Sequence, residues 1–70
     1  MKLMYDKDED ILTIELSPEA PIDHAEQSGS VIVHLSPKGE PVLLEILDAS
    51  EFLSSVREVV LRGEKGLAVA

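Results

Sequence analysis

The sequence contains no cysteine and no tryptophan, and its 70 residues include one phenylalanine and one tyrosine. Without cysteine there is no disulfide and no metal site built on thiolates. With so few aromatic residues, the hydrophobic core has to be built from isoleucine, leucine and valine. Long apolar runs are also missing, and such runs mark signal peptides and membrane spans. We therefore expect a complete cytoplasmic protein that does not enter the membrane.

Basic residues are scarce as well, with 6 lysines and arginines against 14 acidic residues and a formal net charge of −8. Binding to nucleic acid or to an anionic membrane needs a basic surface, so we expect neither. The acidic excess is greatest in residues 1–27, which hold 8 acids and 2 bases. This charge suits a basic protein partner, or solubility alone.

The length sets a further limit, because 70 residues make a single domain, here residues 1–70. A chain of this size buries only about 60% of its unfolded surface, so a monomer is marginally stable. Tight aliphatic packing or oligomerisation can compensate for this. We expect a homodimer, since two-fold dimers are the commonest assemblies.

Hydrophobic alternation with period two predicts several short strands, separated by turn-forming residues. An acidic turn at residues 6–10, Ser28-Gly29-Ser30 and Pro37-Lys38-Gly39-Glu40 provide the turn signals. The expected strands are 3–5, 11–16, a weak edge strand at 22–27, 31–35 and 42–47.

The period changes at Asp48, and the apolar positions that follow it have helical spacing. Asp48 and Glu51 form a capping-box pattern, and Gly63 suits the helix end. The stripe consists of Phe52, Leu53, Val56, Val59 and Val60. We therefore predict an α+β fold, an antiparallel meander of four or five strands with one C-terminal helix packed on one face. Residues 62–70 are expected to form a frayed tail or an extra edge strand.

One helix covers only one face of such a sheet. By parity, four aliphatic residues lie on the opposite face, and an apolar patch of that kind often marks an interface. We expect self-association through this face, with an interface of Ile11, Ile32, Leu43 and Leu47, or through an edge strand beside it.

Two groups of polar residues are candidate metal ligands. Asp6, Asp8 and Asp10 have the spacing of a calcium loop, but the glycine and glutamate that such a loop needs are absent, so we expect a solvated turn. His24, Glu26 and His34 could form a nitrogen–oxygen site if their strands pair. Isolated surface histidines are the alternative, and we expect no resident metal or cofactor.

Enzymatic activity is not expected. Nucleophilic catalysis needs a nucleophile, a base and an orienting group within reach, and the serines fall in turns or on the helix. A single layer of this size also has little room for a concave pocket.

The chain resembles a small prokaryotic family, the domain of unknown function 2283, over residues 1 to about 50. The matching segments are Met1-Lys2-Leu3, Tyr5-Asp6, Asp10 to Leu16, Gly29 to Val33, Lys38 to Val42 and Glu45 to Ser50. The resemblance implies a short stand-alone protein, with an antitoxin-like partnership with a small toxin in some members. It defines no catalytic or binding residues. The chain departs from the usual pattern at Val42-Leu43-Leu44 and at His34.

Two hypotheses follow. The first is an acidic protein-interaction module, an antitoxin-like partner of a small basic protein. The second is a small-ligand or metal-binding domain that uses His24, Glu26 and His34.

Overall fold

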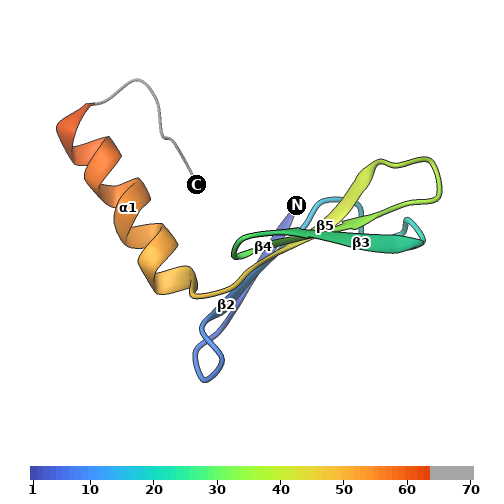
Figure 1. Cartoon of the computed structure of the whole chain (residues 1–70), viewed down its shortest axis with the longest axis horizontal. Helices are drawn as coiled ribbons and strands as arrows, with labels where there is room; N and C mark the ends of the chain where they lie inside the picture. The colour runs from blue at the N-terminus through green and yellow to red at the C-terminus, as the bar shows by residue number, and fades with distance from the viewer. Residues whose placement is uncertain (64–70) are drawn as a thin grey trace.

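The computed structural model describes residues 1–63 as a five-stranded antiparallel sheet followed by one helix (Figure 1). This arrangement confirms the predicted α+β class. The tail or edge strand was expected at residues 62–70, but Arg62 is the last residue of the helix and Gly63 is its C-cap, while residues 64–70 lie outside the described part. The elements are β1 (Lys2–Asp6), β2 (Ile11–Glu15), β3 (His24–Ser28), β4 (Val31–Leu35), β5 (Pro41–Ile46) and α1 (Ala49–Arg62).

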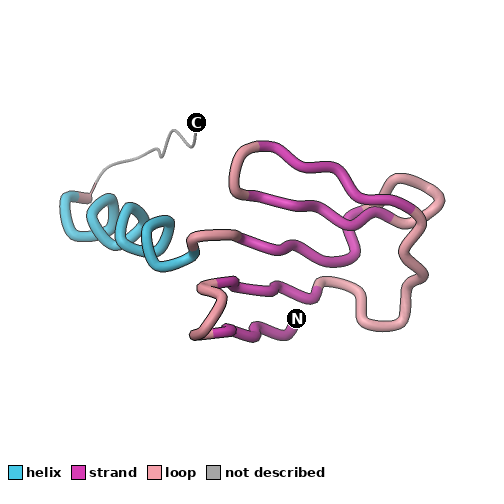
Figure 2. The backbone as a smooth tube through the Cα atoms, turned by 60° about the horizontal axis from the view of Figure 1, so that its bottom comes forward, coloured by secondary structure: helices cyan, strands magenta, loops and turns pink. Residues whose placement is uncertain are grey.

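The spatial order of the strands is β1-β2-β5-β4-β3, and every neighbouring pair is antiparallel. Strands β3, β4 and β5 follow one another as a meander, and β1 and β2 form a separate hairpin. The two units join through β2 and β5, so the last strand in the chain lies at the centre of the sheet (Figure 2). Strands β1 and β3 are the two edges.

Local hydrogen bonds hold the turns between the strands. Asp6 Oδ1 accepts hydrogen bonds from the backbone N–H groups of Asp8 and Glu9, at 3.0 and 3.1 Å, as expected of an aspartate in a turn. Gly29 begins the two-residue β3–β4 loop with a φ of 58°, a conformation that glycine adopts without a steric penalty. The acidic segment after β1 is a structured turn, because the two hydrogen bonds to Asp6 Oδ1 hold it.

The strand register assigns six aliphatic side chains to one side of the three central strands. Residues directly opposite each other in an antiparallel pair share a face. Leu12 is opposite Ile46, and Ile46 is opposite Val31, while Ile14, Leu44 and Val33 form the next row. We call this side the apolar face, made of Leu12, Ile14, Val31, Val33, Leu44 and Ile46.

The other side of the sheet carries aliphatic, charged and polar residues together. We call it the mixed face. It consists of Ile11, Thr13, Glu15, Ile32, His34, Leu43 and Glu45. Each face has a distinct chemistry because the period-two pattern of the sequence carries over into the register.

The helix position differs from the sequence-based expectation of packing on one sheet face. Helix α1 lies beyond the end of the strands and does not cover either face, as both views show (Figures 1 and 2). The helix was expected on a sheet face because its amphipathic stripe needs an apolar surface to bury it. Here the contacts at the start of α1 direct it away.

Within residues 1–63, no helix has the length and apolar character that crossing a membrane requires.

The two helix ends gave different outcomes. Asp48 is at the N-cap position, but its side chain makes no capping hydrogen bond and its backbone is left-handed, with a φ of 51°. The predicted Asp48 capping interaction is therefore wrong. Gly63 ends the helix with a φ of 69°, and its N–H bonds the carbonyls of Val59 and Val60, which confirms the predicted C-terminal glycine.

Candidate interaction surfaces

The apolar face is incompletely covered. Of its six side chains only Ile46 is buried, at 5% exposure, and the other five are half-buried. Leu3 and Tyr5 extend the face onto the edge strand β1, where they are 60% and 50% exposed. Across residues 1–63 the buried apolar residues are Val42, Ile46 and Ala49. A sheet with one solvated side normally carries polar residues on that side, so this face needs a cover.

The helix carries a second apolar surface that the sheet does not cover. Leu53 and Val60 are 45% and 72% exposed, and the other members of the stripe are half-buried. We call this surface the helix stripe, made of Phe52, Leu53, Val56, Val59 and Val60. An amphipathic helix gains most of its stability in proteins from burying such a stripe.

Asp10 connects the β1–β2 hairpin to the start of the helix. Its Oδ1 accepts hydrogen bonds from the Tyr5 hydroxyl at 2.6 Å and the Ser50 N–H at 3.0 Å, while its Oδ2 accepts one from the Ser50 hydroxyl at 2.7 Å. The Asp10 carbonyl accepts a further bond from the Ala49 N–H at 2.9 Å. Asp10 therefore caps the helix N-terminus, the task that the sequence pattern predicted for Asp48. We call Tyr5, Asp10 and Ser50 the hairpin–helix clamp.

The clamp shifts two pKa values in opposite directions. The hydrogen bonds from Tyr5 and Ser50 lower the pKa of Asp10 below its ordinary 3.8, because they stabilise the carboxylate. The pKa of Tyr5 is raised above 10.0, chiefly by its hydrogen bond to Asp10 and further by the negative charge of that carboxylate. Both effects favour the same state, a neutral Tyr5 donating to an ionised Asp10.

The residues expected to form an interface opposite the helix lie on the mixed face and just beyond it. Ile11, Ile32 and Leu43 belong to β2, β4 and β5, and Leu47 follows β5, where its N–H bonds the Ser30 carbonyl at 2.7 Å. All four are half-buried. The expected interface stays a prediction.

Polar groups separate these four residues. Glu45 is directly opposite Ile32 on β4 and Thr13 on β2, and its Oε1 is hydrogen-bonded with His34 Nε2. The apolar area on this side is therefore less continuous than the apolar face.

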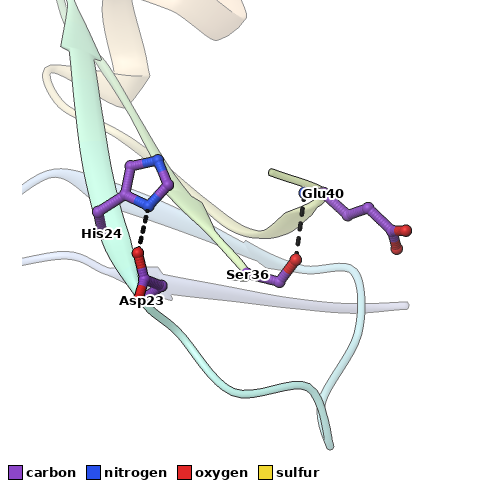
Figure 3. A network of polar contacts seen from close by, with 4 residues as sticks. All are labelled: Asp23, His24, Ser36 and Glu40. Atoms are coloured by element: carbon purple, nitrogen blue, oxygen red, sulfur yellow. Dashed lines mark hydrogen bonds and ion pairs between the residues drawn. The ribbon is translucent and has the colours of Figure 1, made fainter. Parts of the chain in front are cut away.

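The candidate metal ligands do not converge. Glu26 is opposite Val33 and His24 opposite Leu35, whereas His34 is opposite Ala25, so His34 lies on the other side of the sheet. His24 Nδ1 instead contacts Asp23 Oδ2 at 2.8 Å, close to the β4–β5 turn in which Ser36 Oγ accepts from the Glu40 N–H (Figure 3). Among the described residues, no group of three or more potential ligands could hold a metal ion.

Two features of these surfaces were not predicted from the sequence. The clamp joins residues 40 positions apart, and no local pattern indicates it. The second feature is that His24 and His34 lie on opposite faces of the sheet, and this could have been found from the sequence. With a two-residue loop at Gly29 and Ser30, strand pairing places an even-numbered residue of β3 opposite an odd-numbered residue of β4. The two histidines then fall on opposite faces.

The arrangement defines a small α+β protein with two incompletely covered apolar surfaces, the apolar face and the helix stripe. A family model, described as protein of unknown function (DUF2283), matches residues 2–50, and the chain belongs to this family. The matched region contains the whole sheet and ends at Ser50 of the clamp. Comparison with the curated proteins and with the solved structures gave no match.

Proposed function

We propose that this chain is a non-enzymatic protein-interaction module that binds a protein through the apolar face of its sheet. The observation that carries the proposal is the exposure of this face. Six aliphatic residues adjoin one another on three strands, and the chain's own helix does not cover them. Apolar surfaces of this continuity on small proteins mark interaction sites.

The charge distribution supports a finer proposal about the partner. Residues 1–48 hold 11 of the 14 acids and 3 of the 6 bases, so the full net charge of −8 lies in the sheet and its turns. Such a field accelerates encounter with a positively charged protein and disfavours acidic ones. A small basic protein, contacted through the mixed face and the acidic turns, fits this charge. A cytoplasmic location and an antitoxin-like role remain part of the proposal.

Ligand binding at His24, Glu26 and His34 has no support in the geometry, because these side chains lie on two faces of the sheet. The interaction hypothesis is therefore the one to test first.

Site-specific photocrosslinking in the native host tests this function. The photoreactive amino acid p-benzoylphenylalanine is placed at position 33 on the apolar face, or at position 32, the adjacent residue of β4 on the mixed face. We expect position 33 to give a protein adduct of defined mass, and position 32 to give less of it. The two sites share a strand and differ only in the face, so each controls for the other.

The other outcomes are also informative. Adducts that form mainly at position 32 would transfer the binding surface to the mixed face. No protein adduct at either position would reject the interaction module. For the antitoxin-like role, the adduct at position 32, on the mixed face, should contain a small basic protein that inhibits growth when expressed alone and ceases to do so when this chain is present.

A further inference from the structure

The chain has two complementary apolar surfaces that do not meet within one copy, the apolar face and the helix stripe. We propose that the helix stripe of a second copy covers the apolar face, and that the exchange is reciprocal. The product is a two-fold dimer in which each helix packs on the sheet of its partner. The proposal rests on the proposed function and names the occupant of the same surface.

The clamp explains why the helix does not cover its own sheet. Asp10 bonds the first two N–H groups of the helix, at Ala49 and Ser50, through its carbonyl and its carboxylate. Ala49 is fully buried beneath these contacts, and Asp48 makes a left-handed turn with a φ of 51°. Folding the helix back over its own apolar face would break these bonds. A second copy can cover the face while the clamp stays intact.

The dimensions of the two surfaces agree. A helix of 14 residues is about 21 Å long. Strands of five to six residues are about 17–20 Å long, and three adjacent strands span about 10 Å between the outer two. A helix is about 10 Å wide with its side chains. One helix laid along the central strands therefore covers the apolar face.

Electrostatics favours a helix over a second sheet as the cover. Helix α1 contains two acids, Glu51 and Glu58, and two bases, Arg57 and Arg62, so its formal charge is zero. Residues 1–48 of each copy carry −8. Packing two sheets face to face would bring these charges together at short range, whereas a neutral helix approaches without repulsion.

Sedimentation equilibrium with matched helix variants is the first test. The native chain should have twice its 7.6 kDa mass at micromolar concentration. Val56→Asp places a charge in the helix stripe, and it should raise the dimer dissociation constant at least about tenfold. Ser54→Asp adds the same charge on the opposite side of the helix and should change that constant by less than about twofold. A monomeric native chain, or a Val56→Asp dimer as tight as the native one, would overturn the proposal.

Disulfide trapping tests the geometry without adding charge, and the absence of native cysteine makes it specific. Chains with Val56→Cys are refolded together with chains of different mass that carry Val33→Cys, and then oxidised. We expect a disulfide between the two kinds of chain, because exchange brings these positions together. Ile32→Cys, on the other face of β4, is the matched control and should stay unlinked.

The double variant with both Val33→Cys and Val56→Cys distinguishes helix exchange between two copies from packing of the helix on its own sheet. Exchange predicts disulfides between copies, whereas a disulfide within one monomeric chain would overturn the proposal.

Photocrosslinking separates the failure of the second-copy proposal from the failure of the proposed function. A position-33 adduct with a different protein would reject the second copy and retain the interaction module, while no adduct would reject both.

Discussion

Asp10 and Ser50 are 40 residues apart in the chain and are joined by two hydrogen bonds, from the Ser50 N–H at 3.0 Å and from its hydroxyl at 2.7 Å. A carboxylate at a helix N-terminus both satisfies free N–H groups and interacts favourably with the helix dipole. This contact fixes the direction in which the helix leaves the sheet, and it is the basis of the first two predictions.

Asp10→Asn should lower the urea midpoint more than Asp48→Asn does. Asparagine tolerates the left-handed backbone at both positions, so the comparison isolates the lost carboxylate. Only Asp10 accepts hydrogen bonds from the helix start through its side chain. Urea unfolding followed by circular dichroism measures both midpoints. An equal or larger effect of Asp48→Asn would mean that Asp48 is the cap in solution.

The clamp should also make stability depend on pH at both extremes. The pKa of Asp10 is lowered on folding, so its contribution is complete above about pH 3.8 and is lost as the pH falls through the lowered value. The pKa of Tyr5 is raised, so its contribution is complete below pH 10.0 and is lost as the pH rises through the raised value. The difference in unfolding free energy between the native chain and Tyr5→Phe should therefore be constant from about pH 4 to pH 10 and smaller outside that range. A difference that does not change with pH would contradict the clamp.

Ile46→Ala should reduce the unfolding free energy by about 2–5 kcal/mol, because it empties space at the centre of the sheet. Ile46 is 5% exposed and opposite both Leu12 and Val31. Leu3→Ala, on the edge strand at 60% exposure, is the control and should cost less than about 1 kcal/mol. Chemical denaturation at one fixed protein concentration gives both values. Similar costs at the two positions would show that burial is not concentrated on the central strands.

The contact between His34 Nε2 and Glu45 Oε1, which is an ion pair only when the imidazole is protonated, should contribute little. Both side chains keep contact with water, at 23% and 31% exposure, so solvent screens the interaction. A double-mutant cycle with His34→Ala and Glu45→Ala should give a coupling of about 0.2–1 kcal/mol, weaker at high salt. A coupling well above this range would indicate that the mixed face is buried in solution, as the sequence-based interface hypothesis expects.

The strands and the C-terminal end of the helix were predictable from the sequence because they depend on local periodicity and turn chemistry. Val31 to Leu35 was placed correctly, and Gly63 ends the helix as its left-handed preference indicates. Parity also assigned Ile32 and Leu43 to the same face, as the register shows. Strand alternation and turn formation depend on residues that are close together in the sequence, and the pairing of the strands preserves the alternation.

Long-range contacts were the part that sequence patterns missed. The pattern at Asp48 and Glu51 is typical of a cap, but the acceptor comes from Asp10 on a hairpin far away in the sequence. The helix stripe was correctly identified as amphipathic, although periodicity specifies only that a stripe needs a cover and not which surface provides it. The site at His24 and His34 was conditional on strand pairing, and the strands do pair, but their register places the two side chains on opposite faces.

The central position of β5 has a consequence for the order of folding. The β1–β2 hairpin and the β3–β4–β5 meander each contain only local pairings, while β2 and β5 meet across about 30 residues. Local pairings form quickly, and closing the longer loop is the slower step. The segment 16–23 connects the two units, and it also bonds to the sheet, since Leu16 and Ser17 donate to the Val42 carbonyl and Asp23 donates to the Leu35 carbonyl. A chain cut there should regain the sheet when the two fragments are mixed, with a rate that depends on their concentrations.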